Sequence, residues 1–153
     1  MACVELAGSG DEPGSMDDNV IETGKELARV LKGRLVVFHA FDPMTAIGHA
    51  ATWAVKPELL PGDALRRKLR DAQSDVLDRF AGRHGLPADQ RLLKSGSVRS
   101  TLPGTVTELH ATVTILGAVG GRDDRNGRGR IGSTAESVMD HIAGDLLVLQ
   151  PGS

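Results

Sequence analysis

Residues 34–40 read Arg-Leu-Val-Val-Phe-His-Ala, a near-continuous apolar run. Such runs are typical of strands in a parallel sheet that helices cover on both faces. A strand with one solvent-exposed face instead alternates polar and apolar residues. An amphipathic segment precedes the run from Asp17 to Leu31, with Asp17 or Asp18 as its expected cap and Gly33 just past its end. A helix that leads into a doubly covered strand predicts an α/β fold.

The same alternation continues along the whole chain. Further short apolar runs predict strands at residues 3–7, 91–94, 112–117 and 146–149, and helical periodicity predicts helices at residues 63–84, 100–110 and 133–142. The resulting βαβαβαβαβ order predicts one doubly wound α/β domain over residues 1–153, with right-handed crossovers. We expect five parallel strands, or four with an antiparallel neighbour.

One long irregular stretch interrupts this order between Phe41 and Gly62, and it contains three prolines. Connections of this length inside compact domains are uncommon and are often functional. Its apolar residues fit either a lid over a ligand or a docking segment for a protein partner, and the sequence leaves both open.

Composition restricts the class of function. Eighteen Lys and Arg against twenty Asp and Glu give a net charge of −2, and aromatic residues make up only 3%. This balance argues against nucleic-acid binding and against binding to anionic membranes. The single cysteine, Cys3, cannot form an internal disulfide, and no apolar run is long enough for a membrane helix, so we expect a soluble cytoplasmic protein.

The segment from Gly117 to Thr134 is the most unusual part of the chain, with six glycines and four arginines among its eighteen residues. It follows a predicted strand and opens a predicted helix, and ligands of open α/β sheets bind beyond the carboxyl ends of the strands. Glycines let backbone N–H groups approach a phosphate, and Ser133 or Thr134 could cap the helix or contact that phosphate. The alternative is a solvated surface loop with an ordinary cap. Most of its arginines fit the solvated interpretation, and Arg130 is the best candidate for a phosphate contact because it lies nearest the helix.

The pattern Gly-x-x-Gly, a spacer and then Gly-Ser-Thr-Ala-Glu-Ser resembles the universal stress protein family. The Gly8-Ser9 turn, the end of the strand at residues 38–40 and the closing run at residues 145–149 fit the same family, most closely the second half of its tandem-domain members. The resemblance implies a flavodoxin-like, mainly parallel five-stranded sheet in the order 3-2-1-4-5. It also implies a homodimer formed through the last strand, at Leu146, Leu147, Val148 and Leu149.

The nucleotide-binding branch of that family holds ATP, with or without Mg²⁺, through Gly-x2-Gly-x9-Gly-(Ser/Thr). The matching positions here are Gly117, Gly120, Gly132 and Ser133, with Thr134 next in line, while Ala40 and the turn after the first strand would lie beside adenine. Leu116 at the end of its strand and Arg130 are added to this set. The expected nucleotide-binding residues are therefore Ala7, Gly8, Ala40, Leu116, Gly117, Gly120, Arg130, Gly132, Ser133 and Thr134.

Two features depart from the family pattern. Eleven residues separate Gly120 from Gly132 instead of nine, and Ala7 stands where the family usually has an Asp that helps recognise adenine. Glu5 or Asp11 could replace that carboxylate. These departures keep a second hypothesis open, in which the domain is a homodimeric interaction module that binds no nucleotide. The chain could also form one half of a longer tandem protein.

Other chemistry finds little support in the sequence. The five histidines have no metal-site spacing, and neither a Gly-x-Ser-x-Gly elbow nor a P-loop is present. His39 at a strand end fits a hydrogen-bonded packing role better than a catalytic one, and Gly8-Ser9-Gly10 is a weak match to a dinucleotide-binding turn. We therefore expect an adenine-nucleotide-binding stress-response sensor or regulator, not an enzyme, with at most slow incidental ATP hydrolysis.

Overall fold

The computed structural model describes residues 1–6, 14–43, 62–117 and 133–150. Within these ranges five strands form one all-parallel sheet in the order β3-β2-β1-β4-β5. The strands are β1 (Ala2–Cys3), β2 (Val37–Phe41), β3 (Arg91–Ser95), β4 (Val113–Gly117) and β5 (Asp145–Leu149). The predicted fold class and strand order are confirmed, and the sheet is parallel throughout.

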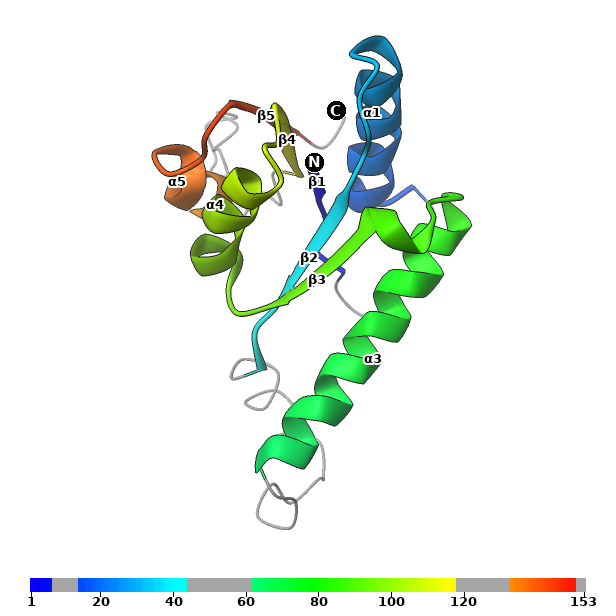
Figure 1. The fold of residues 1–153 in the computed structure, drawn as a ribbon, viewed down its shortest axis with the longest axis vertical. Coiled ribbons are helices and arrows are strands. Elements are labelled where there is room, and N and C mark those ends of the chain that lie inside the picture. The colour runs from blue at the N-terminus through cyan, green and yellow to red at the C-terminus, as the bar shows by residue number, and fades with distance from the viewer. Residues whose placement is uncertain (7–13, 44–61, 118–132, 151–153) are drawn as a thin grey trace, which may run out of the picture.

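Helices cover both faces of the sheet, as Figure 1 shows. They are α1 (Met16–Val30), α3 (Gly62–Arg83), α4 (Val98–Glu108) and α5 (Ser133–Met139), with a short 3₁₀ turn η2 (Ala88–Gln90) before β3. Helices α1 and α3 lie on one face, and α4 and α5 lie on the other. Two apolar layers result, one around Val20, Ile21 and Phe80 and one around Phe38, Leu102 and Val138.

The cap of α1 differs from the prediction. Ser15 is the N-cap: its Oγ accepts a hydrogen bond from the Asp18 amide at 3.2 Å, and the Asp18 carboxylate accepts one from the Ser15 amide at 3.2 Å. This reciprocal pair is a capping box, so Asp18 serves at the third helical position and neither aspartate is the cap itself.

Several boundaries also differ by a few residues. Helix α4 begins at Val98 because Ser97 caps it, which leaves Pro103 inside the helix rather than near its start. Helix α5 ends at Met139, before the predicted Ile142, and the His141 amide closes its end on the Val138 carbonyl at 3.0 Å. Strand β1 covers two residues, although the Val4 amide still bonds the Phe38 carbonyl at 3.0 Å.

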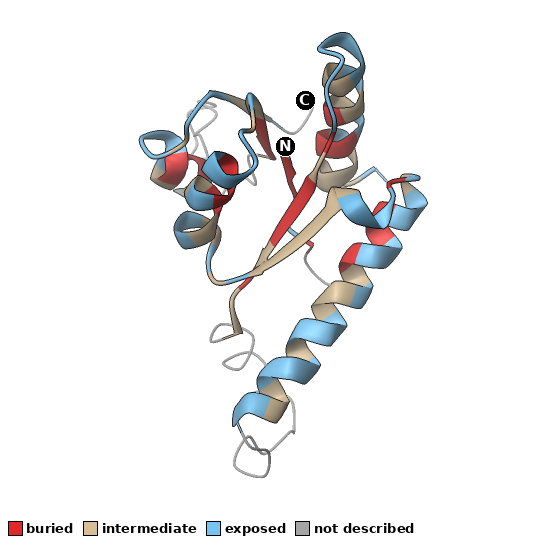
Figure 2. Ribbon diagram, in the orientation of Figure 1, coloured by how far each residue is buried: buried red, intermediate tan, exposed pale blue. Residues whose placement is uncertain are grey.

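Burial is concentrated in the middle of the sheet, and the first half of α3 extends beyond it (Figure 2). The buried residues of α3 are Leu77, Phe80 and Ala81, all in its second half. The preceding turns contribute no buried side chain. The first half of this helix therefore adds little to the core, and its residues are available for other roles.

Candidate functional site

The register of the sheet places two predicted site residues on either side of β1. Cys3 pairs with Phe38 of β2 and with Leu116 of β4, so Ala40 and Gly117 lie beyond that level at the carboxyl edge. Because neighbouring strands are about 4.8 Å apart, these two positions are separated by roughly 10 Å across β1. The strand order reverses between β1 and β4, which makes this edge the switch point where doubly wound sheets bind ligands.

The described residues include only part of the predicted site. Ala40, Leu116 and Gly117 lie at the edge, Ser133 is the first residue of α5, and Thr134 follows it with an exposed side chain. Leu116 is buried in the layer below α4 and α5, so it offers a ligand its backbone and not its side chain. The other predicted residues lie outside the described ranges; they are Ala7, Gly8, Gly120, Arg130 and Gly132.

Gly117 has a packing role that the sequence did not indicate. A Cβ at this position would lie 2.5 Å from Cγ of Met16 and 3.5 Å from Cγ2 of Val20, both in the first part of α1. The separation from Met16 is far below van der Waals contact, so with a larger residue at this position either the Met16 side chain or α1 would have to shift. Gly117 therefore brings α1 against the end of β4 at the same edge where the nucleotide is expected.

Asp17 is a carboxylate at this edge that the sequence analysis considered only as a cap. Its Oδ1 accepts a hydrogen bond from the Glu5 amide at 2.9 Å, which ties α1 to the end of β1. Burial raises the pKa of Asp17, and the hydrogen bond from Glu5 opposes that rise. The sequence offered one indication of this role, a second acid directly before Asp18. Because the Asp18 carboxylate completes the capping box, the Asp17 carboxylate is left to face the end of β1.

His39 has the packing role that the sequence favoured. The side chain is buried, with Nδ1 3.1 Å from the Val4 carbonyl and Nε2 3.1 Å from Oε1 of Gln73. Both ring nitrogens are thus engaged, one with β1 and one with α3. The ring links three elements and leaves no nitrogen available for a substrate.

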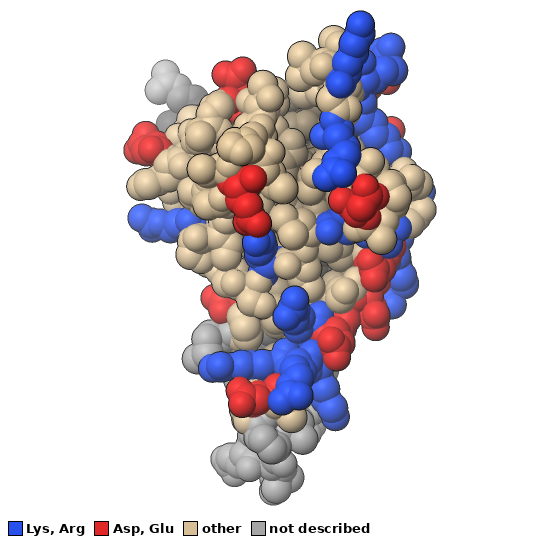
Figure 3. All heavy atoms as spheres, viewed as in Figure 1, with Lys and Arg blue, Asp and Glu red and all other residues tan. Residues whose placement is uncertain are grey.

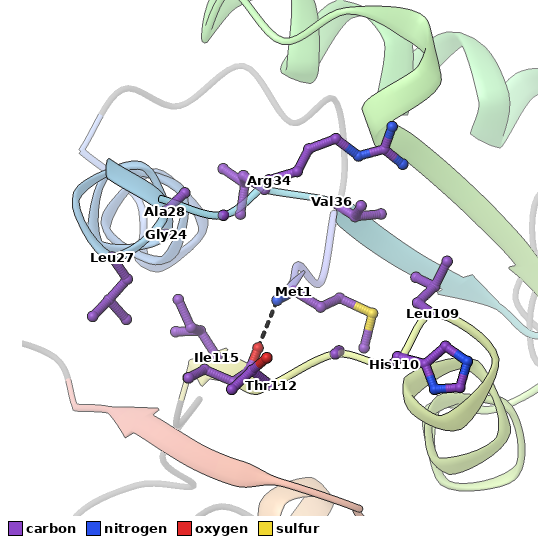
Figure 4. Close-up of a pocket in the computed structure, with 14 residues that line it drawn as sticks. Met1, Gly24, Leu27, Ala28, Arg34, Val36, Leu109, His110, Thr112 and Ile115 are labelled. Carbon is purple, nitrogen blue, oxygen red and sulfur yellow. Dashed lines mark hydrogen bonds between the residues drawn. The ribbon is translucent and has the colours of Figure 1, made fainter. Parts of the chain in front are cut away.

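Two cavities lie away from the switch point. The first, about 280 Å³, is at the amino end of the strands, between α1 and the turn that leads from α4 into β4. Figure 4 shows Leu27, His110 and Ile115 among its lining residues, with the Met1 amine donating to the Val113 carbonyl at 2.6 Å. The second, about 390 Å³, lies at the carboxyl ends of β2 and β3 beside α3. Since the first cavity is at the opposite edge of the sheet, it is not the predicted nucleotide site.

Known proteins share this arrangement. The model of the universal stress protein family matches residues 11–150, nearly the whole chain. The chain belongs to the universal stress protein family. Universal stress protein E of Escherichia coli strain K12 is 26% identical to it over 153 residues, covering 99% of this chain and 46% of that protein. This universal stress protein chain therefore spans about half the length of the curated relatives it matches, which is consistent with its resemblance to one half of a tandem protein.

Solved structures agree with the assignment. A putative universal stress protein from Pseudomonas aeruginosa UCBPP-PA14 is 25% identical with a TM-score of 0.69, covering 98% of this chain and 46% of that one. Universal stress protein UspA from Lactobacillus plantarum is 16% identical with a TM-score of 0.60, covering 90% and 92%. The latter likeness shows the fold alone.

Membrane-spanning helices and metal-binding clusters are both absent from the described ranges. No helix among these residues is long and apolar enough to cross a membrane. No group of three or more His, Cys, Asp or Glu side chains in the same ranges could hold a metal ion.

Proposed function

We propose that this universal stress protein domain binds ATP at the carboxyl edge of β1, β2 and β4, and that it acts as a cytoplasmic stress-response sensor or regulator rather than as a catalyst. The observation that carries the proposal is the register, which puts Ala40 and Gly117 on the two strands that flank β1 at the switch point. This geometry supports an adenine beside β2 and phosphates beyond β4.

The phosphate contacts would come from the segment between β4 and α5. Backbone N–H groups of Gly120 and Gly132 would donate to phosphate oxygens, the Ser133 hydroxyl would add a donor, and Arg130 would add charge. Bound Mg²⁺ would offset the negative charge of the triphosphate. Asp17 is our candidate for the carboxylate that Ala7 lacks, because it already faces the end of β1.

A regulatory role is favoured over catalysis by the groups at this edge. Hydrolysis needs a base that can take a proton from water. Among the described residues the nearest candidates are Asp17, which accepts a hydrogen bond from the Glu5 amide, and His39, whose two ring nitrogens are both engaged. We therefore expect ATP hydrolysis to stay near background.

A thermal-shift titration with ATP, ADP, AMP and NAD, with and without Mg²⁺, tests the proposal. A ligand that binds only the folded state at a hundredfold excess over its Kd stabilises it by about 2.7 kcal/mol. A larger shift for ATP than for AMP is expected, because the triphosphate makes the additional contacts. A shift with NAD alone, or no shift at millimolar ATP, would contradict ATP binding.

The second candidate function is a homodimeric interaction module, and one observation favours it. Strand β5 lies at the edge of the sheet, where β4 is its only partner among the described strands. Four of its five residues are apolar. An edge strand presents unpaired N–H and C=O groups that a second copy can pair with. We propose that Leu146, Leu147, Val148 and Leu149 form this dimer interface, whether or not ATP is bound.

A further inference from the structure

The cavity beside α3 is unusual for its charge. It is lined by Phe41, Pro43, Asp63, Arg66, Arg67, Arg70 and Ser95. Three guanidinium groups thus face one carboxylate. Figure 3 shows Lys and Arg side chains gathered over the lower end of α3, around this position. The chain as a whole has a net charge of −2, so the cavity has a local excess of positive charge in a slightly acidic protein.

The three arginines form no ion pair among the described residues, whereas several other arginines do. Arg29, Arg34, Arg83 and Arg91 each form an ion pair with an acidic side chain. In contrast, no ion pair to another described residue forms at Arg66, Arg67 or Arg70. Their side chains are exposed, and this half of α3 contributes nothing buried to the core. The packing of the protein therefore does not explain why three arginines line one cavity.

The shape and walls of the cavity suit a small ligand. Its volume of about 390 Å³ is within the range of about 300–1,000 Å³ that small-molecule sites occupy. Phe41 is buried and Pro43 is half-buried, and together they form an apolar wall at the end of β2. Ser95, at the end of β3, is the register partner of Phe41 and adds a hydroxyl donor beside this wall.

We propose that this cavity binds a small anion that carries a diphosphate or triphosphate group. Guanidinium groups form bidentate hydrogen bonds with phosphate oxygens, and the apolar wall reduces the competition from water. A singly charged carboxylate would leave most of the positive charge unmatched, whereas a multiply charged phosphate group matches it. The site is built from α3 and the ends of β2 and β3, so it is separate from the proposed ATP contacts of the segment between β4 and α5.

Calorimetric titration with inorganic triphosphate at 150 mM NaCl tests the proposal. The triple variant Arg66→Gln, Arg67→Gln, Arg70→Gln should bind triphosphate at least tenfold more weakly than the wild-type protein. A matched variant, Lys68→Gln, Arg79→Gln, Arg99→Gln, removes the same charge from exposed helix positions outside the cavity, and should change the Kd less than threefold. Circular dichroism should show the same fold in both variants, because all six residues are exposed.

Three results would overturn the proposal. One is the absence of wild-type binding at millimolar triphosphate, and another is an equal loss in the two triple variants, which would indicate general electrostatic attraction. Equal affinity for citrate would show that charge alone is recognised and not phosphate. Gly132→Val separates this site from the ATP site: it should abolish ATP binding by the segment after β4 and leave the triphosphate affinity unchanged. Loss of triphosphate binding in that variant would place the anion after β4 and contradict the cavity.

Discussion

A methyl group at position 117 would lie 2.5 Å from Cγ of Met16, and this single contact connects the packing of α1 with the predicted ligand edge. The glycine pattern that begins at Gly117 is expected to let the backbone approach a phosphate. In this chain the first glycine also lets α1 pack directly against β4. Stability and the proposed ATP binding therefore place the same requirement on Gly117.

Gly117→Ala should lower the free energy of unfolding by about 1–3 kcal/mol, because the added methyl forces Met16 or the helix to move. Urea denaturation followed by circular dichroism measures the change. Gly82→Ala is the matched control: a Cβ there meets nothing within 4 Å, and an exposed helical alanine should add roughly 0.5–1 kcal/mol.

A double variant gives the sharper test of the packing role. Met16→Ala removes the atoms that the new methyl would meet, so Gly117→Ala should cost much less stability in that background. Equal costs in the two backgrounds would show that the contact with Met16 is not the cause.

Asp18 holds a network that joins the start of α1 to the end of α3. Its carboxylate accepts hydrogen bonds from the Gly14 amide at 2.6 Å, from Nε2 of His84 at 2.7 Å and from Nη2 of Arg83 at 2.8 Å. Burial alone would raise the pKa of Asp18, but the hydrogen bonds from His84, Arg83 and Gly14 together lower it.

The sign of the pH dependence follows from this lowered pKa. A carboxyl whose pKa is lower in the folded state contributes its full stability above its unfolded pKa of about 3.9, and loses that stability as the pH falls through the folded value. Asp18→Asn should therefore cost about 1–3 kcal/mol at pH 7 and give a flatter loss of stability below about pH 4. Urea unfolding at a series of pH values measures both effects.

Asp75→Asn serves as the control, because Asp75 is an exposed residue of α3 outside this network. It should leave the pH profile as in the wild type. If the free energy of unfolding of Asp18→Asn fell with decreasing pH as steeply as that of the wild type, the assigned network would be contradicted. Asp17 acts in the opposite direction, since burial raises its pKa and protonation favours the folded state as the pH falls.

At the scale of elements, β5 carries the proposed dimer contact. Its inner edge pairs with β4 over all five residues, and its side chains are packed on both faces of the sheet, Leu147 and Leu149 toward α1 and Leu146 and Val148 toward α4 and α5. The outer edge has no partner among the described strands. Pairing with a second copy would cover it.

Light scattering after size exclusion should give twice the chain mass at micromolar concentration. Val148→Pro removes a backbone donor from β5 and should shift the protein toward the monomer. Unfolding curves should confirm that the variant keeps its sheet. A wild-type monomer at all concentrations would contradict the dimer.

The helices and strands were predictable from the sequence in part. The centres of the helices and strands followed from apolar periodicity, because burial on both faces of a parallel sheet leaves near-continuous runs such as residues 34–40. Their ends were harder to predict: Ser15 and Ser97 cap helices that the pattern began at Asp17 and Ser100. Capping depends on backbone geometry at one residue, which periodicity does not report.

The candidate site was predictable to a similar extent. The resemblance to a family implied the strand order, and with it the switch point and the site residues. The packing role of Gly117 and the bond from Asp17 to β1 could not be predicted, since both depend on how α1 approaches the sheet. The arginine-lined cavity could not be predicted from the sequence, because only the tertiary structure brings Arg66, Arg67 and Arg70 to the ends of β2 and β3.

At the scale of the whole molecule, the edges of one sheet have different proposed roles. The carboxyl edge at β1 and β4 is the proposed ATP site, the same edge at β2 and β3 has the arginine-lined cavity, and the side edge at β5 is the proposed dimer contact. The proposed regulatory role depends on the ATP site.

Calorimetric titration of ATP into the wild-type protein and into the Gly132→Val and Ser133→Ala variants tests the ATP site. We predict saturable binding by the wild type and a loss of about 1–2 kcal/mol of binding free energy in Ser133→Ala, if its hydroxyl contacts phosphate. Gly132→Val should lose binding at the switch point, because its side chain would occupy the path of the phosphate, and should keep only the binding of the triphosphate group in the arginine-lined cavity. Absence of wild-type binding at millimolar ATP, or equal affinities in all three proteins, would contradict the proposed site.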